Sequence, residues 1–483
     1  MMESVDRQEC SWRKTTLVSL YLAATLFFLA PAVRAQEEPS LAPWSPAFEQ
    51  YLQDVEFGKA KILKAGEFPP GIVPPPVEFP RKVLKSMEFV TAALPSAYDL
   101  RKKNRVTSVK DQGSCGCCWA FATYGSLESR LMPKETWDFS EENLIETHGF
   151  DKTPCQGGNF NMAAAYLARW SGPIRESADP YTHAAVRAAP KPAKHVAEAV
   201  FLPERATPED NDSLKTIVKK YGGVAAYMYY SSSYYDSSNY AYYYGGSSST
   251  NHGITIVGWD DNFSREKFKA YNGSAPSGDG AFIVKNTWGE DFGEKGYFYV
   301  SYYDTSIEPY MAFSTVDAAT KYNLLFQYDP LGAVTGLGFS STRAWGANIF
   351  KAKVQFSLKA VGFHTLVPNT SFIAYVYKDV AEGQPRSGTL VAKVKGKFPM
   401  AGYHTVPVDP VKILKGQRFS VVIRFTTPNY NYPVPIESPV PNYSSNATSA
   451  AGQSFMSSGG TVWSDVYQTF TNSNVCIKAM GVK

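Results

Sequence analysis

The segment from Gln112 to Phe121 constrains the fold of this chain more than any other part of its sequence, because it places the thiol of Cys118 at the start of an apolar run. The residues that can share one helical face in this run are Trp119, Ala122, Leu127 and Leu131. Pro133 is expected to end the helix. The unpaired N–H groups at a helix N-terminus carry partial positive charge, which lowers the pKa of a thiol placed there. We therefore expect a helix whose first residue carries a reactive thiolate.

A thiolate that attacks a carbonyl group also needs a base, an orienter for that base and donors for the oxyanion. His252 lies in an alternating, β-branched run from Asn251 to Trp259, which predicts a buried strand that holds the imidazole rigidly. Asn286 lies in a second such run, from Phe282 to Gly289. A neutral amide can fix the tautomer of the imidazole without removing the imidazolium charge that keeps the sulfur ionised. The order along the chain is nucleophile, base and orienter.

With this order and these neighbours, the chain resembles the papain-like cysteine peptidases in the signature around the cysteine and in the spacing from Cys118 to His252. Asn286 lies a little beyond the spacing typical of the family, which extra loop residues would explain. The resemblance implies that Cys118 is the nucleophile, His252 the general base and acid, and Asn286 the orienter. It also implies that Gln112 and the Cys118 backbone N–H form the oxyanion hole.

The resemblance implies further residues around the same cleft. It pairs Cys115 with Cys155 in a disulfide, and it assigns Gly157 and Gly158 to binding of the extended peptide substrate. Trp288 is expected to shield the contact between the asparagine and the histidine from water. The implied fold class is α+β, with a two-lobed catalytic domain made of a helical lobe and a β-barrel-like lobe.

Cys117 departs from the family pattern, which has serine or alanine before the nucleophile. Cys118 is the preferred nucleophile because Trp119 must follow it directly in the signature. Cys117 could be inert, could form a strained or mixed disulfide, or could bind a metal with Cys115 and Cys118. The metal alternative is weak, since zinc needs a fourth ligand and this spacing matches no standard pattern. We expect no metal and no cofactor.

The N-terminal residues predict export. Arg7, Arg13 and Lys14 precede an apolar stretch, and the small residues before position 36 fit a signal peptide over residues 1–35. A single-pass anchor is the alternative, although the apolar stretch is short for a membrane span. No later segment could cross a membrane. The expected location is secreted, periplasmic or extracellular, which suits a disulfide and leaves Cys117 and Cys476 without an assigned role.

Residues 36–93 are acidic at first and then proline-rich, which predicts an extended strap with one short helix around residues 47–63. This region could be a propeptide that covers the cleft, or a permanent N-terminal extension. The sequence from Leu94 resembles the start of mature papain-like enzymes, so we expect the peptidase domain over residues 94–318. The net charge is only +4, with no block of Lys or Arg, so nucleic acid is not an expected partner.

Two further sets of residues leave alternatives open. The tyrosine-rich stretch from Tyr227 to Thr250 could form an aromatic wall beside the cleft or an ordinary loop and strand pair. Phe160 and Thr250 are candidate wall residues of a substrate pocket. The histidines outside the candidate site are expected to be surface or satisfied polar residues; they are His148, His183, His195, His364 and His404.

Residues 319–483 contain short β-like runs separated by Gly, Pro and Asn, which predicts an antiparallel β-sandwich. The runs are 354–358, 372–377, 390–394 and 419–423. This region resembles the lectin-like domain that follows the catalytic domain in some bacterial and archaeal relatives. A carbohydrate or cell-surface ligand is implied only by that analogy.

The leading functional hypothesis is a secreted cysteine endopeptidase that acts on polypeptide substrates through a thioester. The first alternative is a catalytically silent binding or adhesion protein, in which the sandwich recognises glycan or a cell surface. The second is a transferase, because an acyl-enzyme does not dictate whether water or an amine accepts the acyl group. The complete set of four candidate site residues favours an enzyme.

Overall fold

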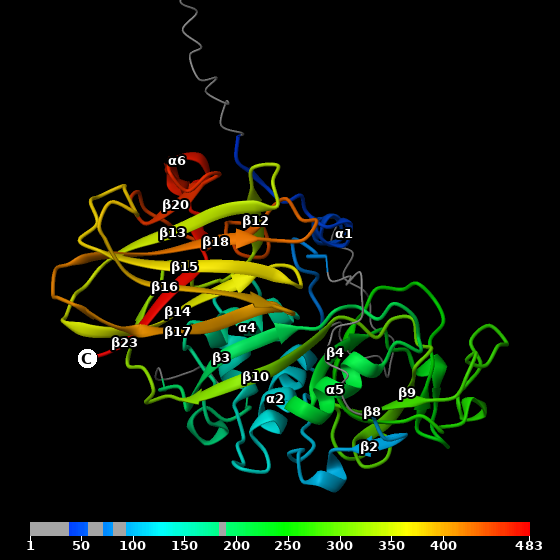
Figure 1. The fold of residues 1–483 in the computed structure, drawn as a ribbon. Helices are drawn as coiled ribbons and strands as arrows, with labels where there is room; N and C mark the ends of the chain where they lie inside the picture. Colours follow the sequence, from blue (N-terminus) through cyan, green and yellow to red (C-terminus); the bar gives the residue numbers. More distant parts are fainter. Residues whose placement is uncertain (1–37, 57–70, 81–92, 183–189) are drawn as a thin grey trace, which may run out of the picture. The chain divides into compact units, whose positions relative to one another are not determined.

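The structure, a computed structural model, describes residues 38–56, 71–80, 93–182 and 190–483 (Figure 1). The predicted signal peptide lies outside the described residues. Within them, the helices are α1 (Pro46–Glu56), α2 (Cys118–Leu131), α3 (Glu141–Thr147), α4 (Phe160–Ala168), α5 (Asp212–Tyr221) and α6 (Val466–Thr469), with 3₁₀ turns at Arg101–Lys103, Glu176–Ala178, Ser232–Tyr234 and Arg265–Lys267.

Helix α2 forms the centre of a helical lobe and packs against α3 and α4. The predicted helix is confirmed: it begins at Cys118 and ends at Leu131, and the four predicted apolar side chains are all buried. Helix α3 begins after Ser140, whose Oγ accepts a hydrogen bond from the Asn143 N–H at 2.9 Å. This is an N-cap, which pairs one of the donors that a helix start leaves unpaired.

The strands between residues 94 and 318 build the second lobe. They are β2 (Ala97–Asp99), β3 (Lys194–Phe201), β4 (Val224–Met228), β5 (Tyr235–Asp236), β6 (Ala241–Tyr242), β7 (His252–Asp260), β8 (Ala281–Lys285), β9 (Tyr297–Ser301) and β10 (Tyr310–Ala318). Strand β7 pairs with β4 on one side and β8 on the other, and eight of its nine residues are buried. Both strands predicted around the candidate base and orienter are therefore present, and β7 begins at His252.

The strands after residue 319 form the predicted sandwich. They are β11 (Leu324–Phe326), β12 (Thr335–Gly338), β13 (Arg343–Lys351), β14 (Phe356–Thr365), β15 (Thr370–Lys378), β16 (Thr389–Phe398), β17 (Ala401–Ile413), β18 (Arg418–Thr426), β19 (Val434–Glu437), β20 (Ser454–Ser457), β21 (Ser464–Asp465), β22 (Asn474–Val475) and β23 (Ile477–Val482). A six-stranded sheet, in the order β16-β15-β18-β13-β20-β21, shares an apolar core with β14, β17 and β23 (Figure 1). The α+β fold class with an all-β C-terminal region is confirmed.

Three of the four predicted sandwich runs lie inside β15, β16 and β18, whereas β14 starts two residues later than predicted. The chain turns just before β14, through a bend at Lys353 and Val354. Residues at such a turn cannot join the ladder, so the strand begins at Phe356.

The sandwich and the β-rich lobe share one sheet. Strand β17 pairs antiparallel with β3, with Gly402 opposite Val200 and His404 opposite Glu198. Gly402 has a φ of 136°, and a Cβ there would overlap the Ala199 carbonyl oxygen, so only glycine fits this close approach. The long sheet therefore continues from β8 and β7, through β4, β10 and β3, into β17 and β14.

The described part of residues 36–93 contacts both regions. Strand β1 (Ser40–Leu41) pairs with β12 of the C-terminal region, and Phe48 of α1 is fully buried against Tyr443 at 5.9 Å between ring centroids. The predicted helix over 47–63 is confirmed as α1 up to Glu56, and its remainder lies outside the described residues. No helix in the described part of the chain is long and apolar enough to span a membrane.

Candidate active site

The helical lobe and the β-lobe meet at the Cys118 thiol. Cys118 is fully buried at the start of α2, and its Sγ accepts a hydrogen bond from the Gly253 N–H of β7 at 3.1 Å. A Cβ on Gly253 would touch the Cys118 backbone at 3.0 Å, so glycine permits this close approach of the two elements. The first residues of α2 and β7 are thus brought together, as the sequence predicts.

The imidazole of His252 is held on two sides. Its Nε2 lies 2.8 Å from Asn286 Oδ1, and the Trp288 ring stacks on it with 4.2 Å between centroids. Asn286 directly follows β8, which pairs with β7, so strand pairing fixes the separation of the two residues. Because the amide oxygen can only accept, Nε2 carries the proton, which leaves Nδ1 as the acceptor nitrogen of the neutral ring.

Burial keeps both reacting groups neutral in this form of the chain. It lowers the pKa of His252 to about 4, against the opposing hydrogen bond with Asn286. It raises the pKa of Cys118 to about 12, against the opposing N–H groups of Gly253 and of the α2 start. At neutral pH the pair is therefore thiol and imidazole, and an ion pair would require water to reach the cleft.

The Gln112 side chain is held by hydrogen bonds at both its nitrogen and its oxygen. Its Nε2 donates to the Cys115 carbonyl at 2.7 Å, and its Oε1 accepts from the Thr287 hydroxyl. An amide nitrogen carries two N–H groups, so one remains for a substrate oxygen. Thr287 is a residue of this site that the sequence reasoning missed; only its position directly after Asn286 could have drawn attention to it.

A disulfide joins Cys115 to Cys155. It brings the loop before α2 against the turn that carries Gly157 and Gly158, and Gly116 forms a parallel bridge with Gln156 beside it. A Cβ on Gly158 would overlap the Trp119 ring, so this turn lies directly on the first turn of α2. The two candidate substrate-binding glycines therefore lie next to the candidate nucleophile.

The strap predicted within residues 36–93 lies next to these glycines and the thiol. Val73 N–H donates to the Gly158 carbonyl at 2.9 Å, and Gly158 N–H donates to the Gly71 carbonyl at 3.2 Å. Gly71 N–H also donates to the Asn251 carbonyl at 3.1 Å, and a Cβ on Gly71 would overlap Cys118 Sγ. Residues 71–73 thus lie across the thiol and pair with the backbone of Gly158, a candidate substrate-binding residue.

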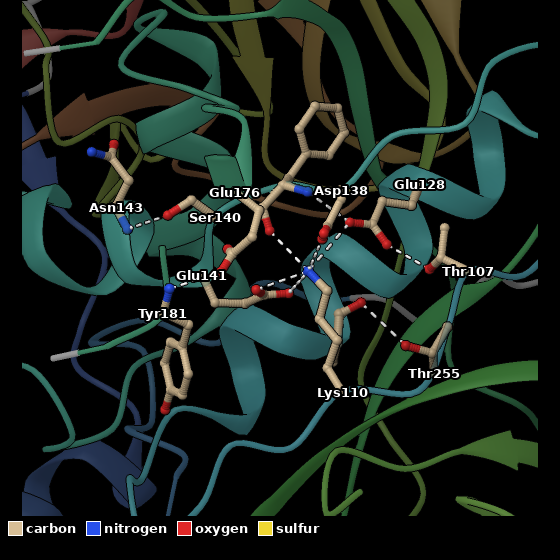
Figure 2. A network of polar contacts seen from close by, with 12 residues as sticks. Thr107, Lys110, Glu128, Asp138, Ser140, Glu141, Asn143, Glu176, Tyr181 and Thr255 are labelled. Carbon is tan, nitrogen blue, oxygen red and sulfur yellow. Dashed lines mark hydrogen bonds and ion pairs between the residues drawn. The ribbon is translucent and has the colours of Figure 1, made fainter. Parts of the chain in front are cut away.

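The segment that leads into Gln112 is anchored by a half-buried cation (Figure 2). Lys110 Nζ lies 2.7 Å from Asp138 Oδ1 and 2.9 Å from Glu141 Oε1, and it donates to the Phe139 carbonyl at 3.0 Å. The Lys110 carbonyl accepts from the Gly289 N–H at 3.1 Å. The network therefore ties the loop before the thiol to α3 and to the segment after Asn286.

The tyrosine-rich stretch supplies an aromatic wall at the imidazole. Tyr230 packs edge-on against Trp288 at 4.7 Å and lies 6.2 Å from the His252 ring. Of the other candidate wall residues, Phe160 is buried and stacks on Tyr227 at 4.0 Å, whereas Thr250 lines a cavity of about 480 Å³ beside the strap.

No other cysteine or histidine among the described residues forms a hydrogen bond with the Cys118 thiol or the His252 imidazole. Cys117 and Cys476 are buried and free, and Cys115 is held in its disulfide, which removes it from any three-thiol metal site. The described histidines outside the site are all buried, so none of them is a surface residue; they are His148, His195, His364 and His404. His148 and His404 are satisfied by hydrogen bonds, as expected, whereas His195 Nδ1 and His364 Nε2 are buried without a hydrogen-bond partner in the described part of the chain. His183 lies outside the described residues.

Comparison with known proteins places both regions in families. Residues 94–314 match the papain family cysteine proteases, and residues 325–481 match the lectin-like domain. A viral cathepsin of Choristoneura fumiferana nuclear polyhedrosis virus is 32% identical over 208 residues, 43% of this chain and 59% of that protein. Vignain of Vigna mungo is 28% identical over 207 residues, 42% of this chain and 54% of that protein. The chain thus spans little more than half the length of these relatives.

Among solved structures, the cysteine protease and lectin-like domains of Cwp84, a surface layer associated protein of Clostridium difficile, match 93% of this chain and 99% of that one. The identity is 25% and the TM-score is 0.77. A second structure, of a Cwp84 variant after propeptide cleavage, matches with a TM-score of 0.70, over 80% of this chain and all of that one. Residues 94–314 of the chain therefore match the papain family of cysteine proteases, and a region that matches the lectin-like domain follows them over residues 325–481.

Proposed function

We propose that the chain is a secreted cysteine endopeptidase that uses Cys118, His252, Asn286 and Gln112. The observation that carries the proposal is the meeting of the α2 start with the β7 start, where Gly253 N–H reaches Cys118 Sγ beside an imidazole oriented by Asn286. This arrangement supports thiol acyl transfer, which requires a nucleophile, a base and an orienter for that base.

The chemistry follows from these positions. His252 accepts the Cys118 proton, and the thiolate attacks the carbonyl carbon of the scissile peptide bond. The resulting oxyanion accepts from Gln112 Nε2 and from the Cys118 N–H. As the C–N bond breaks, the imidazolium gives its proton to the leaving amine, and a thioester remains. Water, deprotonated by His252, then attacks the thioester, and the C–S bond breaks to return the thiol.

We propose the strap as a propeptide. The Gly71 backbone covers the thiol, and its carbonyl accepts from Gly158, whereas Gln112 Nε2 points to Cys115. Residues 71–73 therefore block the cleft, and the Gly71 carbonyl is paired with Gly158 and not with the oxyanion donors. A propeptide cleavage is named for Cwp84, which supports the same division here, with residues 36–93 removed and residues 94–318 as the peptidase domain.

We propose export and a surface role on the same comparison. Cwp84 is named as a surface layer associated protein, and the N-terminal sequence of this chain fits a signal peptide over residues 1–35. The substrates would be polypeptides. The lectin-like domain over residues 319–483 is the candidate to bind a carbohydrate or cell-surface ligand.

The test is labelling with a thiol-directed epoxide. The processed, reduced protein should be labelled on Cys118, as located by mass spectrometry, and should cleave a peptide library. Cys118→Ala should lose both label and cleavage, whereas Cys117→Ala should keep the label. An unlabelled Cys118 would favour the silent binding protein, and transfer of the acyl group to an added amine in preference to water would favour the transferase.

A further inference from the structure

The Cys117 side chain points away from the cleft and into the helical lobe. Its Sγ lies 3.0 Å from the Tyr181 hydroxyl and 3.7 Å from the Cys115 carbonyl. The residue occupies the N-cap position of α2, yet its side chain makes no capping hydrogen bond to the helix. Burial raises the pKa of this thiol, so it remains a protonated donor at neutral pH.

Tyr181 links this thiol to the backbone of Gln112. Its hydroxyl donates to the Gln112 carbonyl at 2.8 Å. A phenol carries one hydrogen, so the Cys117 thiol is the donor in the contact between Cys117 and Tyr181. A chain of two hydrogen bonds therefore runs from Cys117, through Tyr181, to Gln112.

The tyrosine itself is held in place. Its ring packs edge-on against Phe121 of α2 at 5.0 Å between centroids, and its backbone N–H donates to Glu176 Oε1 at 2.7 Å. Figure 2 shows this backbone contact at the edge of the Lys110 network, with the ring extending away from it. Because the ring and the backbone of Tyr181 are both held, its hydroxyl is in a fixed position and can hold the loop before α2.

The two residues at the ends of this hydrogen-bonded series, Cys117 and Gln112, adjoin the two proposed oxyanion donors. Gln112 supplies its own Nε2, and Cys117 immediately precedes the residue whose N–H is the second donor. The loop from 112 to 118 sets the distance between these donors, and a displacement of about 1 Å in such a site costs roughly 10²-fold in rate. A contact that fixes both ends of the loop would therefore act on transition-state stabilisation.

We propose that Tyr181 is a positioning residue of the oxyanion hole, and that Cys117 is its partner. The hydroxyl holds the Gln112 backbone and the Cys117 side chain from behind the loop. This gives the unusual thiol at position 117 a role that needs neither redox chemistry nor a metal. The inference rests on the proposed peptidase function of Cys118.

Tyr181→Phe tests the proposal, because it removes the hydroxyl and keeps the ring against Phe121. In the processed enzyme we expect kcat on a peptide substrate to fall about tenfold, less than the roughly 10²–10³-fold lost with an oxyanion donor itself, at nearly unchanged KM. The affinity for a peptide aldehyde, whose adduct with the thiol carries an oxyanion, should fall by a similar factor. Alkylation of Cys118 by iodoacetamide forms no oxyanion, so its rate should stay within about twofold of wild type.

Variants at position 117 provide the matched control. Cys117→Ser keeps a donor and should retain most of the activity, whereas Cys117→Ala should lower kcat in the same manner as Tyr181→Phe, and the double variant should show less than the product of the two effects. Unchanged kcat and aldehyde affinity in Tyr181→Phe would overturn the proposal. A fall of turnover, aldehyde affinity and alkylation by one common factor would also overturn it, because that indicates a general structural role. A wild-type protein that is neither labelled nor active contradicts the proposed function instead.

Discussion

In the proposed mechanism, the amide of Asn286 determines which nitrogen of His252 acts on the thiol. Its oxygen holds Nε2 at 2.8 Å, and the Trp288 ring lies over the same imidazole. The contact is neutral, so it orients the ring while leaving the imidazolium stabilised by the thiolate alone. A charge at position 286 would change that balance.

Asn286→Asp should move the alkaline limit of activity upward. A carboxylate beside Nε2 favours the charged imidazolium and raises the pKa of His252 in the thiolate–imidazolium pair, by about one unit or more. Activity is lost as pH rises through that pKa, so the loss should begin at higher pH than in wild type. The pH profile of kcat/KM for the processed enzyme measures this. A profile with the same alkaline limb would show that residue 286 does not contact the working imidazole.

At the scale of single residues, the sequence predicts the candidate reacting side chains better than the residues that hold those side chains in place. Cys118, His252 and Asn286 have side chains whose reactivity and order point to a reaction, and the structure brings all three to one cleft. Thr287 and Tyr181 act through hydroxyl groups on Gln112, and a hydroxyl beside a motif has no signal of its own. Their contribution depends on loops that meet only in the folded chain.

Two parts of the strap are held by separate contacts. Strand β1 and helix α1 fix its N-terminal part, and Ser45 N–H donates to the Pro76 carbonyl at 2.8 Å. The part over the thiol, residues 71–73, is shorter than the N-terminal part and is held by its backbone pairing with Gly158. Displacement of residues 71–73 alone should therefore open the cleft without unfolding the whole strap.

Gly71→Ala should open the cleft of the unprocessed chain. The added Cβ would overlap Cys118 Sγ, so the strap must move and let water and reagents reach the thiol. Iodoacetamide should then label Cys118 faster in the full-length protein, as followed by mass spectrometry. The control is Gly459→Ala, because a Cβ there meets nothing nearer than the Thr461 hydroxyl oxygen at 3.8 Å. Equal labelling rates for the two variants would contradict the placement of the strap.

Helices and strands could be predicted from the sequence where a single segment shows a clear hydrophobic periodicity. Helix α2 and strands β7, β15 and β18 follow from periodicity alone. The pairing of β17 with β3 joins segments that lie far apart in the sequence, and each of them reads as an ordinary strand. Strand pairing depends on which edges remain open after folding, so the continuous sheet could not be predicted from local pattern.

At the scale of the whole molecule, the Arg169 guanidinium is one of the groups that link the helical lobe to the lectin-like region. Arg169 Nη1 donates to the His148 carbonyl and to the Pro330 carbonyl, both at 2.9 Å. The imidazole of His148 is buried in the same place, where its Nδ1 accepts from the Phe150 N–H at 2.9 Å. Burial, together with the Arg169 charge, lowers the pKa of His148 to about 4.

His148 should make the stability of the chain sensitive to acid. The native imidazole stays neutral down to about pH 4, whereas the unfolded one takes up a proton near pH 6.5, so its contribution is lost as pH falls between these values. The loss between about pH 7 and pH 5 is about 2 kcal/mol. In a Cys118→Ala background, which prevents self-cleavage, the difference in Tm between His148 and His148→Asn should shrink over that range. Asparagine can still accept from Phe150, and a Tm difference independent of pH would contradict the prediction.

The shared sheet also protects an edge. Without β17, strand β3 would present a row of unpaired N–H and carbonyl groups next to β10, which is the template that leads strands of different molecules to aggregate. The lectin-like region covers this edge with a strand whose glycine at 402 fits the close approach. The place where one family ends and the next begins is therefore not a place where the chain can be divided: solubility of the peptidase region depends on a strand contributed by its neighbour.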